Sequence, residues 1–370
     1  MVSFSTIFRG KIVQFGYFLS IFAVKSNSSM TSSTRITKVR LWHGAMILIM
    51  AFSFAACTPK PSFRVVDGVM LGTRLHIIAD SPCDTLYQGA MALDREAKRS
   101  MSIFEPNSLL NRLNRNETDS LDKHILYNIL LADSIHRLSD GAYDITVKPL
   151  VEAWGFAAKE ATADPDVDSI LQFVGMEKIR VEGSCLKKSD PRVGLDLNSI
   201  AKGYTVDLLA DYLEATGAEN YIVDIGGEVR CKGHNRQGAA WRIGVESPFD
   251  GNMTDGDYIE RRIALHEGAM ATSGNYRRYY LDQEGNKVAH TIDPRTGYSR
   301  TSRLLSTTVI APTCAEADAL CTMLLAMGDE AALQFVKSHP TMAAYLILAP
   351  EAGDQFEEYL TPAMEQLIIK

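Results

Sequence analysis

Residues 194–204 read Gly-Leu-Asp-Leu-Asn-Ser-Ile-Ala-Lys-Gly-Tyr, and residues 221–228 read Tyr-Ile-Val-Asp-Ile-Gly-Gly-Glu. The first stretch predicts a strand over 193–197 that leads into the clearest helix of the chain, over 199–216. The second stretch predicts a buried strand over its first five residues, which ends at the paired glycines. A strand, a helix and another strand in so short a span indicate a protein of mixed α and β structure.

The same patterns extend on both sides of these stretches. Helical spacing and good helix formers predict further helices over residues 86–101, 109–113, 125–139, 170–174 and 316–327. Alternation and β-forming residues predict a hairpin over 63–79 and strands over 179–186, 229–232, 241–246, 259–265, 277–281, 304–310 and 345–348. Because the strands and helices are interspersed without strict βαβ order, we predict one large α+β domain over residues 63–370.

The N-terminus has the pattern of an export signal. Three basic residues precede an apolar run over residues 46–56, which is too short to span a membrane comfortably and ends Ala-Ala before Cys57. We interpret residues 1–56 as a leader and signal peptide, with Met30 as a possible true start, and residues 57–62 as a lipidated Cys57 with its tether. An ordinary signal peptide with an incidental cysteine is the alternative. Either reading predicts an extracytoplasmic domain, and Thr58 permits anchoring to the outer as well as the inner membrane.

Charge and cysteine usage exclude several classes of protein. The formal net charge is −7, which argues against nucleic-acid binding, because that function normally needs a basic face. The remaining cysteines are odd in number and lack CxxC spacing, so neither a disulfide framework nor a zinc site is indicated; they are Cys83, Cys185, Cys231, Cys314 and Cys321.

The helix that begins near residue 199 carries Lys202 in its first turn. Free backbone N–H groups at a helix start attract anions, and a lysine adds a positive charge, so this segment is a candidate phosphate site. It lacks the spacing of a Walker loop. The alternative is an ordinary helix that Asn198 caps and whose lysine is solvated.

Two further segments could contact a ligand. Tyr143 and Asp144 follow a predicted helix, where a tyrosine could stack on an aromatic ligand and a carboxylate could accept from it; core packing is the alternative for the tyrosine. Asp318 and Thr322 stand four apart on one helix face. With a backbone carbonyl, phosphate oxygens and waters they would suit Mg²⁺, whereas the alternative is an exposed aspartate beside a threonine that bonds its own helix.

Residues 271–297 concentrate polar side chains and end His-Thr-Ile-Asp-Pro-Arg-Thr-Gly from His290 onward. Polar groups this dense are buried only when they are partnered, so the stretch predicts a site for a charged ligand. Histidine suits acid–base chemistry near neutral pH, although a structural histidine is the alternative. Asp293 could tie the turn, and Arg295 could bind phosphate or hold the loop.

Each motif is weak alone, but their order along the chain is specific. The chain resembles the ApbE family, the FAD:protein FMN transferases, through Gly72-Thr73, Met101-Ser102, residues 141–150, Trp154-Gly-Phe, residues 196–204, residues 223–228, Ala271-Thr-Ser-Gly, residues 290–297 and Ala317-Asp-Ala. The resemblance covers nearly all of the chain after residue 62. It implies an α+β fold of the T-fold-like type and Mg²⁺-dependent transfer of FMN from FAD to a Thr or Ser hydroxyl of an acceptor protein, with release of AMP. Acceptors carry a [Ser/Thr]-Gly-Ala-[Thr/Ser] sequence and are often subunits of membrane redox pumps.

The resemblance also assigns roles to individual residues. It implies that the Ser199 carbonyl and the side chains of Asp318 and Thr322 bind Mg²⁺, that Lys202 faces the pyrophosphate and that His290 takes the proton from the acceptor. FAD contacts fall on Leu71, Phe104, Ala142, Tyr143, Asp144, Asp196 and Ile292. Two positions depart from the family pattern, since Leu71 replaces a common Met and Phe104 replaces a common Tyr.

Two other functions are compatible with these residues. An FAD pyrophosphatase would use the same Mg²⁺ site with water in place of the acceptor, and the missing hydroxyl at Phe104 keeps that alternative open. A flavin-binding lipoprotein without catalysis is the second alternative.

Overall fold

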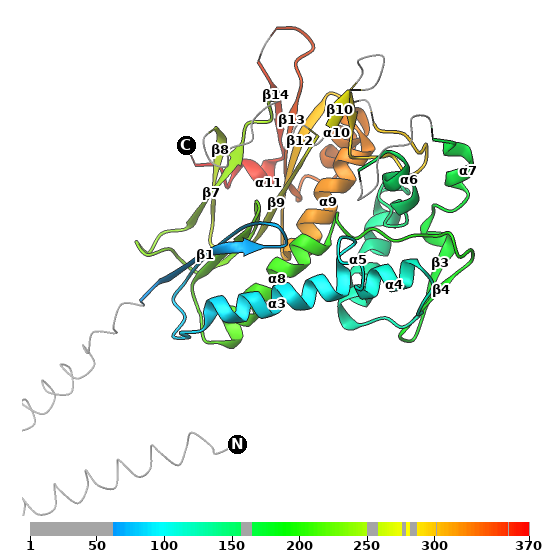
Figure 1. The fold of residues 1–370 in the computed structure, drawn as a ribbon. Coiled ribbons are helices and arrows are strands. Elements are labelled where there is room, and N and C mark those ends of the chain that lie inside the picture. Colours follow the sequence, from blue (N-terminus) through cyan, green and yellow to red (C-terminus); the bar gives the residue numbers. More distant parts are fainter. Residues whose placement is uncertain are drawn as a thin grey trace, which may run out of the picture. The chain divides into compact units, whose positions relative to one another are not determined.

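Eight antiparallel strands form the central sheet of the computed structural model, which describes residues 62–156, 165–249, 258–275, 279–281, 287–300, 302–353 and 355–369. In spatial order these strands are β1 (Arg64–Met70), β2 (Thr73–Ala79), β5 (Tyr221–Ile225), β6 (Glu228–Lys232), β9 (Glu267–Gly274), β12 (Leu304–Ala311), β13 (Ala343–Leu348) and β14 (Glu357–Leu360). The strands lie in the order in which they occur along the chain, and helices and separate two-stranded sheets enter between some of the strands that pair (Figure 1).

Long helices cover one face of this sheet (Figure 1). α8 (Ala201–Ala215) packs on β5 and β6, and α9 (Cys314–Met327) packs on β9 and β12 and against α8. Behind them lie α3 (Leu86–Met101), which contacts α8, and α5 (Lys123–Leu138), which contacts α3 and α9. The two helices α8 and α9 therefore lie side by side on the middle of the sheet.

A second apolar layer covers the opposite face. Strands β7 (Trp241–Glu246) and β8 (Ile259–Leu265) form a separate hairpin, and with α11 (Pro362–Glu365) they share a buried cluster with β6 and β13. Side chains alternate between the two layers along each strand. In β13, for example, Tyr345 and Ile347 join this cluster, whereas Leu346 packs toward the helices.

The shorter elements build the rim of the domain. They are α4 (Leu109–Asn114), α6 (Lys148–Ala153), α7 (Val167–Leu171), the 3₁₀ turn Met176–Lys178, β3 (Ile179–Glu182), β4 (Cys185–Lys188), β10 (Tyr279–Leu281), β11 (Lys287–Ala289) and α10 (Asp329–Ser338). Ser108 immediately precedes α4 and caps it by accepting a hydrogen bond from the Asn111 N–H.

The predicted fold class is confirmed, and so are most elements, including the 63–79 hairpin and the helices over 86–101 and 109–113. Two predictions were wrong in detail, and some elements were missed. The strand predicted over 179–186 is the hairpin of β3 and β4, turned at Gly183. The short helix predicted at 170–174 is α7, which begins at Val167. Strand β9 and helix α10 were missed; small residues such as Gly268 and Ala269 in β9 carry little strand signal.

The strand predicted over 193–197 does not form. Among the described residues this segment belongs to no sheet, and it meets a neighbour through an isolated bridge between Val147 and Gly194 and a hydrogen bond from the Asp196 N–H to the Ile145 carbonyl at 2.8 Å. The Asn114 side chain instead donates to the Leu195 carbonyl at 2.9 Å and accepts from the Leu195 N–H at 2.7 Å. The Asn114 amide thus makes the backbone hydrogen bonds that a neighbouring strand would otherwise make. The following helix begins at Ala201, and Asn198 does not cap it.

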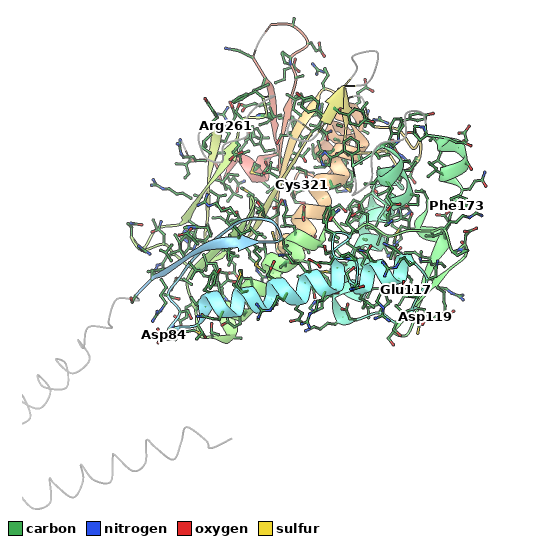
Figure 2. All side chains as sticks on the ribbon, viewed as in Figure 1. Asp84, Glu117, Asp119, Phe173, Arg261 and Cys321 are labelled. Atoms are coloured by element: carbon green, nitrogen blue, oxygen red, sulfur yellow. The ribbon has the colours of Figure 1, made fainter. Side chains whose placement is uncertain are left out.

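Several predictions fall on residues that the structure does not describe. The signal peptide, Cys57 and its tether lie outside the described residues, which begin at Ser62. Within the described ranges, no helix is both long enough and apolar enough to cross a membrane. The five cysteines of the domain are free, and Figure 2 shows Cys321 in the interior on α9, while Asp84, Glu117 and Asp119 lie at the periphery.

Candidate active site

A cavity of about 380 Å³ opens beside α8 and α9, at the turn between β5 and β6. Its walls contain most of the residues to which the family resemblance gave roles: Ala142, Tyr143, Asp144, Asp196, Ser199, Lys202, His290, Ile292, Asp318 and Thr322. These residues come from four segments that are far apart in sequence, so the fold brings together what the motifs only suggested.

The helix side of the cavity depends on a close approach of α8 and α9. Gly203 lies where a Cβ atom would fall well inside contact distance of the Cys314 carbonyl oxygen and 2.8 Å from Asp318 Cβ. The Gly203 N–H donates to Asp318 Oδ2 at 3.0 Å. A glycine here therefore allows the backbone of one helix to bind the carboxylate of the other.

A buried aspartate fixes the start of α9. Asp207 accepts hydrogen bonds from the Cys314 and Ala315 N–H groups, both at 2.9 Å, and from Arg230 Nη1 at 2.8 Å. Burial raises the pKa of Asp207, while these backbone donors and Arg230 oppose the rise. Because Asp207 is on α8 and Arg230 is on β6, this one carboxylate joins three elements around the cavity.

Lys202 forms an ion pair with Glu228 inside the cavity. Lys202 Nζ lies 2.5 Å from Glu228 Oε2, and the glutamate side chain is 3% exposed. Burial lowers the pKa of Lys202, but Glu228 and Asp318 outweigh this and raise it. Burial also raises the pKa of Glu228, against the effect of Lys202. Since the ammonium is in direct contact with the carboxyl oxygen, we treat the pair as ionised.

The residues that could hold a metal ion all supply oxygen. The Asp318 carboxylate is 4% exposed, and burial raises its pKa to about 6. Thr322 stands one turn further along α9, with its hydroxyl 3.5 Å from the Ser273 hydroxyl, and Ser199 lies across the cavity. A carbonyl, a carboxylate and a hydroxyl fit Mg²⁺, which takes few protein ligands and keeps several waters. In the described part of the chain, no group of three or more His, Cys, Asp or Glu could form an alternative metal centre.

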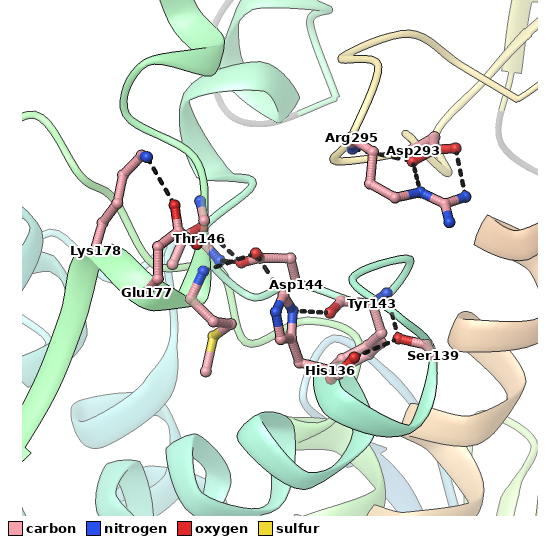
Figure 3. Close-up of polar contacts among 11 residues, drawn as sticks. His136, Ser139, Tyr143, Asp144, Thr146, Glu177, Lys178, Asp293 and Arg295 are labelled. Atoms are coloured by element: carbon pink, nitrogen blue, oxygen red, sulfur yellow. Dashed lines mark hydrogen bonds and ion pairs between the residues drawn. The ribbon is translucent and has the colours of Figure 1, made fainter.

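The loop after α5 forms one wall of the cavity, and Figure 3 shows the polar contacts that hold it. Asp144 accepts from the Thr146 N–H at 2.7 Å, the Thr146 hydroxyl at 2.6 Å and the Met176 N–H at 2.9 Å. Burial raises its pKa against the effect of these donors. The Tyr143 hydroxyl is 2.9 Å from the Ser199 hydroxyl, and burial raises the pKa of Tyr143. Asp144 thus holds its own loop in place besides lining the cavity.

The second loop wall follows His290 and is tied by Asp293. This carboxylate, 1% exposed, accepts from Arg295 through the backbone N–H, Nε and Nη2 at 2.9–3.0 Å, and from Arg300 Nη1 at 3.1 Å. Burial raises the pKa of Asp293, but the two arginines outweigh it and lower the pKa. Arg295 faces a neighbouring cavity of about 270 Å³ rather than the larger one. Of its two predicted roles, the structure supports holding the loop.

His290 lies in the larger cavity beside an aromatic side chain. Its ring and that of Phe156 are 6.4 Å apart between centroids and meet edge to face. The next residue, Thr291, donates its hydroxyl to Asn275 Oδ1 at 2.7 Å. The backbone on one side of His290 is thereby anchored, which limits where the imidazole can reach.

Leu71 and Phe104 do not line the cavity. Leu71 sits in the tight turn between β1 and β2 with a φ of +52°, and its N–H donates to Asp94 Oδ1 at 2.8 Å. Phe104 follows α3 and is 59% exposed. Their predicted FAD contacts stay predictions, since both lie outside this cavity.

Other lining residues were not predicted as site residues. Glu228 and Ser273 belong to motifs that the sequence singled out, residues 223–228 and 271–274, yet nothing in their spacing showed that they face inward. For Glu228, strand alternation is the signal that could have found it, because Glu228 and Arg230 share the helix-facing side of β6. Phe156 carried no such signal.

Comparison with known proteins identifies the family. The model of the ApbE family matches residues 71–346. The FAD:protein FMN transferase of Haemophilus influenzae is 34% identical over 332 residues, which cover 85% of this chain and 94% of the relative. The solved structure of the flavin transferase ApbE from Vibrio cholerae has 32% identity and a TM-score of 0.72, covering 83% of this chain and 99% of that one. The apo flavinyl transferase ApbE of Pseudomonas stutzeri has 27% identity and a TM-score of 0.73, covering 83% and 96%.

Proposed function

Because the chain belongs to the ApbE family, we propose that it is an FAD:protein FMN transferase that moves the FMN moiety of FAD to a Thr or Ser hydroxyl of an acceptor protein. Relatives that match over most of this chain bear that name. The observation that carries the proposal is one cavity that gathers Lys202, His290, Asp318 and Thr322. A cation, a candidate base and a candidate metal site are the parts that phosphoryl transfer requires.

The proposed reaction exchanges the phosphoanhydride bond of FAD for a phosphoester bond to the acceptor. The acceptor oxygen attacks the FMN phosphorus, the bond from that phosphorus to the bridging oxygen breaks, and AMP leaves with the electron pair. His290 accepts the hydroxyl proton. Lys202 faces the pyrophosphate and offsets its negative charge. The apolar sides of Tyr143 and Ile292 offer surfaces for flat rings.

The Ser199 carbonyl, Asp318 and Thr322 would hold Mg²⁺. When bound, the ion would neutralise charge on the phosphate oxygens. The chain's own contribution is to hold Asp318 through the Gly203 N–H and to keep water away from its buried carboxylate.

The decisive assay mixes the full chain, in detergent, with FAD, Mg²⁺ and a protein that carries a [Ser/Thr]-Gly-Ala-[Thr/Ser] sequence. We expect flavin fluorescence on the denatured acceptor, together with one AMP per flavin attached. The matched control acceptor replaces the attacking Thr by Val, which keeps the shape and removes the hydroxyl. Free FMN and AMP with an unlabelled acceptor would identify a pyrophosphatase, and intact FAD would identify a flavin-binding protein without catalysis.

His290→Ala tests the base. Removal of a positioned base lowers the rate by about 10²–10⁴-fold, and we expect FAD binding to change little. The control is His266→Ala, because His266 is exposed, lies outside the cavity lining and places its ring 3.1 Å from the Gly233 carbonyl. Transfer at the wild-type rate in His290→Ala would remove this residue from the mechanism.

Asp318→Ala tests the metal assignment. We expect a large rise in the Mg²⁺ concentration that gives half-maximal rate, because the only predicted carboxylate ligand is lost. An unchanged Mg²⁺ requirement would place the metal elsewhere.

We also propose that Cys57 is lipidated and that the domain faces the periplasm from the inner or outer membrane. The support is the sequence of residues 46–57. Mass spectrometry of the N-terminal peptide from exporting cells would detect the lipid, and Cys57→Ser should release the protein from the membrane fraction. A membrane redox-pump subunit is the partner that this location suggests.

A further inference from the structure

Glu228 is the one member of the cavity's charged wall to which neither the motifs nor the proposed mechanism gives a role. Its side chain is 3% exposed, and its Oε2 atom lies 2.5 Å from Lys202 Nζ. In the described part of the chain, Oε2 accepts no hydrogen bond of good geometry. Its contact with Lys202 is therefore held by charge.

A buried carboxylate is unexpected where an anion must bind. If Lys202 faces the pyrophosphate of FAD, Glu228 lies next to that negative charge and repels it. Asp318, on the same side, has a proposed partner in the metal ion, whereas the cation that contacts Glu228 in the described part of the chain is Lys202. Arg230, the other cation on this side of β6, is already paired with Asp207 at 2.8 Å.

Glu228 can fix the position of the Lys202 ammonium. A lysine side chain has many rotamers, and holding it in one of them costs conformational entropy. Lys202 is in the first turn of α8, and its side chain is about a third exposed. Glu228, fixed on β6 beside the glycine turn, gives the ammonium a defined position before any substrate arrives.

We propose that Glu228 is a positioning residue that holds Lys202 for phosphoryl transfer and, as a consequence, weakens ground-state binding of the pyrophosphate. This inference rests on the proposed function, because it assumes that Lys202 faces phosphate. It predicts that removal of the charge on Glu228 changes binding and turnover in opposite directions, which loss of a metal ligand or of mere packing would not do.

The first test is Glu228→Gln, which keeps the size of the side chain and removes its charge. Titration with ADP by calorimetry without metal measures binding of a pyrophosphate apart from any flavin or turnover. We expect ADP to bind about fivefold more tightly, the effect of a charge interaction near 1 kcal/mol. In the FMN transfer assay we expect kcat to fall about tenfold to a hundredfold, because Lys202 is no longer held.

Glu228→Asp keeps the negative charge and shortens the side chain, so it tests these two properties separately. The shorter side chain keeps the repulsion but draws away from Lys202, so ADP affinity should stay within about twofold of wild type while kcat falls. This variant also keeps the test decisive if Glu228→Gln does not fold.

Glu214→Gln is the matched control. Glu214 pairs with Lys232 at 3.0 Å, and this pair joins the same two elements, α8 and β6, outside the cavity. We expect ADP affinity and kcat to be unchanged. A similar change in this control would mean that any link between the two elements matters, and it would overturn the inference.

Two results for Glu228→Gln would also overturn it. Unchanged ADP affinity with unchanged kcat would leave Glu228 without a role, and a large rise in the Mg²⁺ requirement would make it a metal ligand. The test of Glu228 and the test of the proposed function can fail independently of each other. If the wild-type chain transferred no FMN, tighter ADP binding by Glu228→Gln with Glu228→Asp unchanged would still place Glu228 beside a phosphate site.

Discussion

The two sides of the cavity are held by different physical means. On one side, α8 and α9 pack so closely that Gly203 and Asp318 touch, and Asp207 ties both helices to the sheet. We call this the helix wall. On the other side, residues 142–147 and 290–297 form loops, which we call the loop wall. Each loop is held largely by one carboxylate, Asp144 or Asp293, that accepts from its own loop.

The difference follows from what each wall carries. The helix wall and the adjoining strand β6 hold the charged groups Lys202, Glu228 and Asp318, whose mutual distances decide whether this side attracts a cation or an anion. Charges close together in a buried site need a rigid frame. The loop wall carries His290 and flat apolar surfaces. Small changes in the positions of these groups cost less free energy than changes in the distances between buried charges. We therefore expect substitutions in the helix wall to affect stability and activity together, and substitutions in the loop wall, apart from those of the proposed base His290, to affect them less.

Asp207→Ala should give the largest effect. It removes the acceptor for two backbone N–H groups at the start of α9 and leaves Arg230 without its closest partner, and breaking a buried charge pair costs about 3–5 kcal/mol. Urea unfolding measures the loss, and the rate of FMN transfer should fall because Asp318 moves with α9. The control is Asp211→Ala: Asp211 is 67% exposed and 3.6 Å from Arg230, so we expect about 0.5 kcal/mol at most. Equal losses in both variants would contradict the importance of the helix wall.

Gly203→Ala should rank next. The new methyl group must push α8 and α9 apart, and overpacking of this kind costs about 1–3 kcal/mol. Thermal unfolding gives the stability change, and Mg²⁺ titration of the transfer rate should show weaker metal binding. Gly68→Ala on β1 is the comparison, because its nearest neighbour is Tyr87, a 47% exposed side chain that can move. If Gly203→Ala changed neither the stability nor the Mg²⁺ dependence, the close approach at Gly203 would not be what positions the two helices.

Asp293→Asn should weaken the loop wall by about 2 kcal/mol at pH 7, the cost of losing charge-assisted hydrogen bonds. The folded pKa of Asp293 lies below 3.8, so its charge stabilises the fold above about pH 4 and this contribution is lost as the pH falls through the folded pKa. Urea unfolding at pH 7 and at progressively lower pH measures the free energy of unfolding. The difference in this free energy between wild type and Asp293→Asn should become smaller as the pH falls. A difference that grew toward acid would contradict the ion pairs.

Arg295→Lys should give the smallest effect. Lysine cannot reproduce the two parallel hydrogen bonds to Asp293, so we expect a loss of about 1 kcal/mol. Because Arg295 faces away from the larger cavity, the affinity for FAD should change less than about twofold. A tenfold loss of FAD affinity would instead identify Arg295 as a phosphate ligand and would blur the distinction between the two walls.

Local patterns predicted the elements of the helix wall well. Periodicity found α3, α8 and α9, and the spacing of Asp318 and Thr322 placed both on one face of a helix. The loop wall was harder, because its geometry depends on side chains that bond to backbone. The extended residues 193–197 show this most clearly: Asn114, remote in sequence, takes the place of a strand partner.

Residue order alone indicated the α+β class, the family and a set of polar residues that meet at one site, because these depend on periodicity and on motifs that are local in sequence. Only the tertiary structure decided how those residues pair. It placed Glu228 against Lys202, directed Arg295 to Asp293 and left Leu71 and Phe104 outside the cavity. Such pairings depend on which strands adjoin and how closely two helices approach, and those distances are set by packing between segments far apart in the chain.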